Sequence, residues 1–131
     1  MSTSTFVAML RGGTLWAIHA QIVQAIVAND DWQGSLPFDV SNTLGIGAAD
    51  DVGRHPILLL GAREKPAPLR ALGSVVLKQV DVTRLWAVPE LVRAPARNHA
   101  ISAVALGDGE VPLVVLDPVT LLALAEEHRT S

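Results

Sequence analysis

The sequence predicts an all-β chain that ends in a short helix. Its apolar runs are short and are separated by Gly, Pro and polar residues, which is typical of strands joined by turns. Two pairs of apolar runs flank glycine-containing turns, as the strands of β-hairpins do. Near the C-terminal end, an Asp-Pro pair precedes a stretch with an apolar helical face, so a helix is expected after the last strand.

The first hairpin is expected close to the N-terminus. Phe6 to Leu10 and Leu15 to Ile18 are apolar runs separated by Gly12 and Gly13. Paired glycines can supply the positive φ angles that a tight hairpin turn needs. Ile22 to Val27 follows with β-branched residues, and the sequence predicts a turn there that leads into a strand.

A long loop and a buried strand are expected next. Residues 29–53 are rich in Asp, Gly, Ser and Asn, which predicts mostly loop, with one short strand near Leu44. Ile57 to Leu60 is a continuous apolar run between a proline and a glycine, as expected of a strand buried on both faces. Arg63 to Pro68 is charged and contains proline, so it is expected to be a connection.

The remaining strands are expected as two pairs. Val75 to Val80 and Leu85 to Val88 predict one pair, and Ile101 to Leu106 with Val111 to Leu116 predicts a hairpin around Gly-Asp-Gly. Asp117 can cap a helix that has proline at its first position and leucines along one face.

Two sequence echoes indicate a duplicated unit. Leu-Trp-Ala-Ile at 15–18 recurs as Leu-Trp-Ala-Val at 85–88, and Pro-Ile-Leu-Leu-Leu at 56–60 is echoed by Pro-Leu-Val-Val-Leu at 112–116. Units this small are expected to bury apolar surface against each other. We therefore expect a single domain, residues 1–131, made of two pseudo-repeated lobes with units at about 5–60 and 75–116.

The composition excludes several classes of protein. The 131 residues are 50% hydrophobic and 18% charged, with a formal net charge of -3. Nucleic-acid binding needs clustered Lys and Arg, and the ten in this chain are scattered, so no nucleic-acid partner is expected. Leu15 to Ala28, the longest nearly apolar stretch, is too short to span a membrane, and no signal-peptide pattern precedes it. A soluble, cytoplasmic protein is expected.

Four blocks of sequence carry a family resemblance. They are Leu15 to Ile18 with Ile22 to Val27, Leu36-Pro37, Val75 to Leu77 with Leu85 to Val92, and Val114 to Pro118 with Leu121-Leu122. In this order they resemble the CheW-like family of chemotaxis coupling proteins. The resemblance implies two five-stranded β-barrel lobes with a hydrophobic groove between them, and a non-catalytic adaptor that needs no cofactor.

The resemblance also implies partners. They would be the regulatory domain of a chemotaxis-type histidine kinase, a receptor cytoplasmic tip or another CheW-like protein. The central Asn-Leu-Arg-Gly signature of the family is missing between Leu44 and His55, which favours a specialised motility or signalling pathway. Trp32 is added to the expected interface because it is an aromatic residue in a polar loop. The residues expected to contact a partner are Leu44, Gly45, Ile46, Arg54, Val88, Leu91 and Trp32.

Two other functions stay open. A small enzyme or small-molecule binder would assemble its site from distant residues such as Arg54, His55 and Asp117, and a structural β protein would exchange strands to oligomerise. The four histidines lack the helical spacing of a zinc site, so no metal is expected. Trp16 and Trp86 occupy equivalent places in the echoes and are expected to pack in the two lobes.

Overall fold

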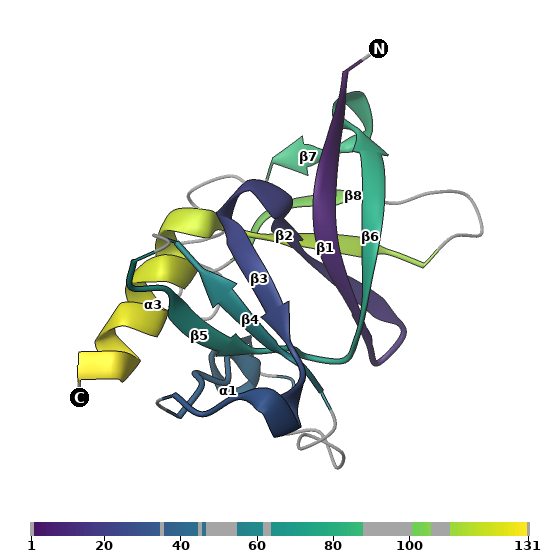
Figure 1. The fold of residues 1–131 in the computed structure, drawn as a ribbon. Coiled ribbons are helices and arrows are strands. Elements are labelled where there is room, and N and C mark those ends of the chain that lie inside the picture. The colour runs from purple at the N-terminus through teal and green to yellow at the C-terminus, as the bar shows by residue number, and fades with distance from the viewer. Residues whose placement is uncertain are drawn as a thin grey trace.

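The protein consists of two β-sheets with a helix at the C-terminal end (Figure 1). The computed structural model describes residues 2–34, 36–44, 46, 55–61, 64–87, 101–105 and 111–130. Besides the helix α3 (Pro118–Thr130), a short helix α1 (Ser41–Leu44) lies in the central part of the chain. The strands are β1 (Thr3–Arg11), β2 (Thr14–His19), β3 (Val23–Val27), β4 (Ile57–Leu60), β5 (Ala67–Arg70), β6 (Ser74–Asp81), β7 (Trp86–Ala87), β8 (Ile101–Ala105) and β9 (Leu113–Leu116). The expected all-β class with a short C-terminal helix is confirmed.

The two sheets differ in size. One has six strands in the order β6-β1-β2-β9-β8-β7, and the other has three in the order β3-β4-β5. Neighbouring strands are antiparallel except β2 and β9, which run parallel with Leu15 opposite Leu113. The expectation of two closed five-stranded barrels is therefore corrected to two open sheets within the described residues. The reason is that β1 and β2 belong to the larger sheet, so they do not close a barrel with β3, β4 and β5.

Both predicted hairpins and the helix cap are confirmed. β1 and β2 pair antiparallel around Gly12 and Gly13, whose φ angles are 60° and 76°. β8 and β9 pair antiparallel as well, and the expected Gly-Asp-Gly turn between them lies outside the described residues. At the start of α3, the carboxylate of Asp117 accepts hydrogen bonds from the backbone N–H of Thr120 at 3.0 Å and from its hydroxyl at 2.7 Å.

Three local expectations are wrong. β6 and β7 do not pair with each other, because β6 pairs with β1 and β7 with β8 at the opposite end of the sheet. Leu44 lies in α1 and not in a strand, since the carboxylate of Asp39 accepts a hydrogen bond from Ser41 N–H at 2.9 Å near the first turn. Pro68 lies in β5, an edge strand of the smaller sheet, where a proline is tolerated.

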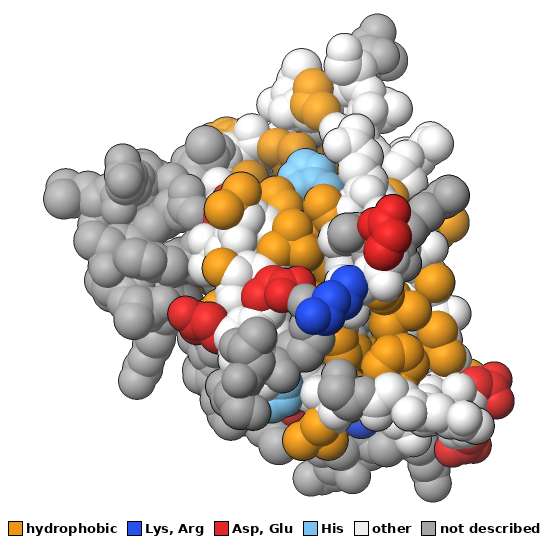
Figure 2. Space-filling view, turned by 60° about the vertical axis from the view of Figure 1, so that its left-hand side comes forward, with side chains coloured by type: hydrophobic (Ala, Val, Ile, Leu, Met, Phe, Trp, Pro, Cys, Tyr) orange, Lys and Arg blue, Asp and Glu red, His pale blue; other side chains and the backbone are white. Residues whose placement is uncertain are grey.

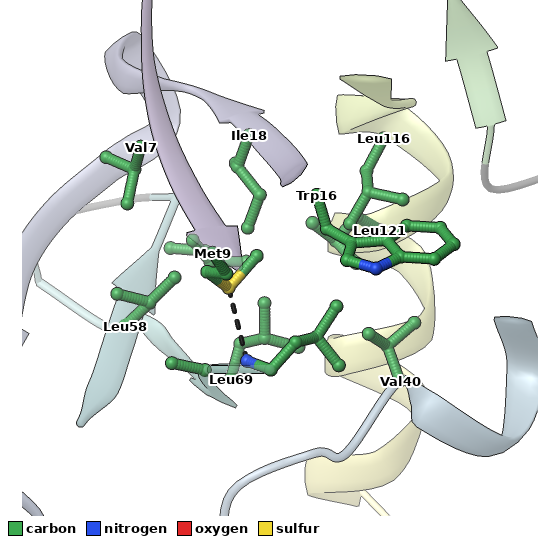
Figure 3. Packing of buried hydrophobic residues seen from close by; sticks show 12 residues of the cluster. Val7, Met9, Trp16, Ile18, Val40, Leu58, Leu69, Leu116 and Leu121 are labelled. Carbon is green, nitrogen blue, oxygen red and sulfur yellow. Dashed lines mark hydrogen bonds between the residues drawn. The ribbon is translucent and has the colours of Figure 1, made fainter. Parts of the chain in front are cut away.

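The structure buries two hydrophobic cores on opposite faces of the β1–β2 hairpin. Successive side chains of a strand point to opposite faces, so Val7, Met9 and Ile18 enter one core and Phe6 and Ala17 enter the other. Core 1 comprises Val7, Met9, Trp16, Ile18, Val40, Leu58, Leu60, Leu69, Ala71, Leu72, Leu116 and Leu121 (Figure 3). Core 2 comprises Phe6, Ala17, Val80, Leu113 and Val115.

Because both cores pack against the β1–β2 hairpin, β1 contains a nearly continuous run of apolar residues. A strand buried on both faces needs apolar residues at successive positions, and Phe6 through Met9 are all buried. Each core also contains residues from both expected repeat units, because Phe6 and Val115 both belong to core 2, and Leu60 and Leu116 both belong to core 1. The two-lobed pseudo-repeat itself stays a prediction.

A methionine sulfur satisfies a buried backbone donor in core 1. The N–H of Leu72 donates a hydrogen bond to Sδ of Met9 at 3.2 Å, marked by the dashed line in Figure 3. We expect Met9→Leu to lower the free energy of unfolding by about 1 to 3 kcal/mol, because the N–H loses its acceptor in a buried site. Urea denaturation measures this difference. Leu58→Met, which changes a buried side chain of the same core without removing an acceptor, is the control and should cost less; an equal cost would contradict the role of the sulfur.

Trp16 and Trp86 do not occupy equivalent environments. Trp16 pairs with Met9 and is buried in core 1. Trp86 pairs with Val104, whereas Ala103 and Ala105 on either side of Val104 pack against core 2. Alternation therefore places Trp86 on the face of the sheet opposite core 2, where it is 74% exposed. The expectation that both tryptophans pack in a core is wrong for Trp86.

Candidate protein-interaction surface

Leu44 and Ile46 lie together on the rim of core 1. Both are half-buried hydrophobic side chains that pack against this core. Part of each side chain therefore contributes to folding, and the exposed remainder is what a partner could contact. Four other predicted contact residues lie outside the described residues: Gly45, Arg54, Val88 and Leu91.

Arg11, the last residue of β1, forms hydrogen bonds with residues of this rim. Its guanidinium donates a hydrogen bond from Nη1 to the hydroxyl of Ser41 at 2.7 Å, and Nη2 lies 3.5 Å from the carbonyl oxygen of Ile46. Ser41 is buried, so the shorter bond is shielded from water. The sequence offered no signal for this contact, because Arg11 and Ser41 are far apart in the chain. The contact holds the rim in place relative to the larger sheet.

The side chain of Trp32 packs against its own loop. It follows a helical turn at Asn29–Asp31, and its N–H donates to the carbonyl of Asn29 at 3.3 Å. The indole lies directly over Gly34, where a Cβ would overlap the ring. Arg70 of β5 donates a hydrogen bond to the side-chain oxygen of Asn29 at 2.9 Å, which fixes the turn to the smaller sheet. Trp32 is thus a half-buried aromatic on a fixed loop.

Several apolar side chains remain on the surface, and most were not singled out from the sequence. On the face shown in Figure 2, hydrophobic side chains form patches between scattered charged ones. Low charge content predicts such patches, but not which strand faces carry them. The large hydrophobic residues most exposed among those described are Leu10, Ile26, Leu36, Val76, Leu77, Val82, Trp86, Val111 and Val119.

A recess opens beside core 2, at the edge strand β6. It has a volume of about 200 Å³, and Val80, Ala105 and Leu113 give it apolar walls that continue core 2. Val111 adds an exposed apolar side chain at its border. Charged and polar residues complete the lining: Lys78, Gln79, Asp81 and Arg84.

Asp81 is held as an anion at the end of β6. Its carboxylate accepts hydrogen bonds from the backbone N–H of Thr83 at 2.9 Å and from the Thr83 hydroxyl at 2.8 Å. These bonds favour the charged form and hold the pKa of Asp81 below its ordinary value. The positive charge of Arg84, which lines the same recess, also lowers the pKa of Asp81.

The volumes of two recesses can be compared with those of ligand pockets. A second recess of about 260 Å³ is lined by Thr3, Ser4, Thr5, His19, Ala20 and Gln21. Both recesses are smaller than the roughly 300 to 1,000 Å³ of typical ligand pockets. Within the described ranges, no group of three or more His, Cys, Asp or Glu residues is placed to hold a metal ion.

Comparison with known proteins shows what the chain resembles. The sequence matches no family model and no curated protein. The crystal structure of the scaffolding protein TtCheW from Thermoanaerobacter tengcongensis superposes with a TM-score of 0.63, at 13% sequence identity, over 89% of this chain and 86% of that chain. The chain has a CheW-like fold. The fold expected from the family resemblance is thereby confirmed.

The superposition extends over most of both chains. Among the helices in the described ranges, none has the length and apolarity needed to cross a bilayer.

Proposed function

We propose that the chain is a non-catalytic signalling adaptor of the CheW type. The observation that carries the proposal is the similarity of its fold to a scaffolding protein over most of both chains. An adaptor needs exposed apolar surface and no reactive centre, and the surface described above offers the first. In keeping with this role, we propose that the protein works in the cytoplasm.

The proposed partners are proteins of a chemotaxis-type signalling system. They are the regulatory domain of a histidine kinase, the cytoplasmic tip of a receptor, or another CheW-like protein. We propose that the interface includes Leu44, Ile46 and Trp32, extended by Gly45, Arg54, Val88 and Leu91. Because the central family signature is absent, we further propose that the partners belong to a specialised motility or signalling pathway.

Isothermal titration calorimetry with purified partners tests the proposal. The partners are the kinase regulatory domain and the receptor tip encoded in the same genome as this chain. We expect at least one to bind, and Trp32→Ala to weaken binding by tenfold or more, because truncating a fixed aromatic anchor removes a large part of the binding free energy.

Val119→Ala is the matched control. Val119 lies on α3 and is 75% exposed, yet it is not part of the proposed interface. Its truncation should leave the dissociation constant unchanged. If neither partner binds the wild-type chain, the adaptor proposal is wrong; if both variants weaken binding equally, Trp32 is not part of the interface.

A further inference from the structure

Ser41 uses all of its polar groups in hydrogen bonds at the rim of core 1. Its N–H donates to the carboxylate of Asp39 at 2.9 Å, and its carbonyl oxygen accepts from the N–H of Ile46 at 3.1 Å. Its hydroxyl accepts from Nη1 of Arg11 at 2.7 Å. The residue is 2% exposed, so water competes little for these bonds. Ser41 therefore joins the first turn of α1, the residue that follows this helix and the end of β1.

Arg11 completes a ring of contacts with two residues of the rim. Nη1 bonds to Ser41, Nη2 lies 3.5 Å from the carbonyl oxygen of Ile46, and Ser41 and Ile46 bond to each other. The guanidinium is planar and holds its N–H groups in a fixed fork, so the two contacts orient the rim together. Because the donor is a cation, its bond to the hydroxyl is stronger than one between neutral groups.

The helix α1 depends on tertiary contacts for its conformation. It has four residues, whereas isolated helices shorter than about 12 residues are marginal in water. Leu44 and Ile46 pack against core 1, but apolar packing is non-directional and does not by itself set which part of each side chain stays exposed. The hydrogen bonds of Arg11 are directional, and they connect the rim to the paired strands β1 and β2. They therefore fix the orientation that packing alone leaves open.

We propose that Arg11 is a positioning residue for partner binding at this rim. It holds Leu44 and Ile46 in the arrangement that a partner binds, so the rim is ordered before the partner arrives and the entropy cost of binding is smaller. Arg11 acts through Ser41 and Ile46 and does not itself contact the partner. The inference rests on the proposed function, because the rim belongs to the interface proposed above.

Arg11→Met tests the effect on the rim in the free chain. Methionine keeps an apolar stem at this position but cannot donate a hydrogen bond to Ser41. Hydrogen–deuterium exchange should become at least tenfold faster at the amides of Leu44 and Ile46, whose N–H groups donate to the carbonyls of Val40 and Ser41 at 3.0 and 3.1 Å. Amides of β9 should change less, because the loss of order is expected to be local.

Isothermal titration calorimetry then measures the effect on binding, with the kinase regulatory domain and the receptor tip as the two probes. Arg11→Met should weaken binding about tenfold with a less favourable entropy, because the partner must then order the rim. Arg11→Lys should recover part of the affinity, since an ammonium group can donate to Ser41 but lacks the planar fork that also reaches Ile46. Ser41→Ala should weaken binding as Arg11→Met does, and combining the two should add no further loss.

Two controls separate positioning from charge and from stability. Lys78→Met removes the same charge from an exposed residue of β6, the strand that pairs with β1, and should leave both exchange at the rim and the dissociation constant unchanged. Val115→Ala lowers stability by opening a cavity in core 2, and it alters no residue of core 1 or the rim. The dissociation constant should not change in this variant either. Circular dichroism verifies that each variant is folded at the measuring temperature.

Three outcomes would overturn the inference while the adaptor proposal stands. They are wild-type affinity of Arg11→Met for a partner that binds the wild-type chain, a loss of affinity with unchanged exchange at the rim, and equal weakening by Arg11→Met and Val115→Ala. The second outcome would identify Arg11 as a direct contact of the partner, and the third would show a general effect of stability. If neither partner binds the wild-type chain, the adaptor proposal is wrong and this inference falls with it.

Discussion

Gly73→Ala is expected to lower the free energy of unfolding by about 3 kcal/mol. Gly73 is buried immediately before β6, and a Cβ at this position would overlap the backbone carbonyl oxygen of Leu10 and lie 3.0 Å from its carbonyl carbon. A side chain can rotate away from such an overlap, but a backbone carbonyl within a strand cannot. The clash would push β6 away from β1 at the point where Leu10 faces Ser74.

Gly12→Ala is the control for this substitution. Gly12 has a φ angle of 60°, but no heavy atom lies within 4 Å of the position that a Cβ would take. Its cost comes from conformation alone, about 1 to 2 kcal/mol for a left-handed residue with a Cβ. Chemical denaturation followed by far-UV circular dichroism measures both variants. A cost at Gly73 no larger than that at Gly12 would show that β1 and β6 do not approach as described.

Phe6→Ala is expected to lower the free energy of unfolding by about 3 to 5 kcal/mol and to destabilise both cores together. Phe6 is completely buried in core 2, and its neighbours Val7 and Met9 on the same strand lie in core 1. Because one hairpin forms a wall of both cores, loss of packing on one face loosens the strand that carries the other. We therefore expect a single unfolding transition at a lower denaturant concentration.

Tryptophan fluorescence can follow core 1 while the substitution is in core 2. In a Trp32→Phe, Trp86→Phe background, Trp16 is the one remaining tryptophan, and it lies in core 1. Its fluorescence transition and the far-UV circular dichroism transition should coincide in the Phe6→Ala variant. Val119→Ala on the exposed face of α3 should change stability by about 0.5 kcal/mol or less. Two separated transitions would instead indicate independently folding lobes.

Local sequence signals were sufficient where the interacting residues are close in the chain. Gly12 and Gly13 predict the first hairpin because positive φ angles are a property of the turn itself, and Asp117 predicts the start of α3 because a cap acts within one helical turn. The pairing of β8 with β9 follows the same logic. The resemblance to the CheW-like family then supplied an architecture that these local signals could not supply.

The sequence pattern could not predict the pairing of strands that are far apart in the chain. Val75 to Val80 has the composition of a strand, but the alternation of its side chains does not show which strand pairs with it. Its partner is β1 and not the next strand along the chain. The exposure of Trp86 has the same cause, because its face depends on its register with Val104. For the candidate site, Leu44 and Ile46 were identifiable from the resemblance, whereas the recess beside β6 joins residues from three separate segments.

The parallel pairing of β2 with β9 also fixes the order of events during synthesis. The β1–β2 hairpin leaves the ribosome first, but Leu15 finds its partner Leu113 only after nearly the whole chain has been made. Core 2 needs Leu113 and Val115, and core 1 needs Leu116 and Leu121, so both wait for the same final segment. Segments made earlier, such as β4, β5 and β6, can contribute to the two cores before then, but a chain that stops before β9 can complete neither core.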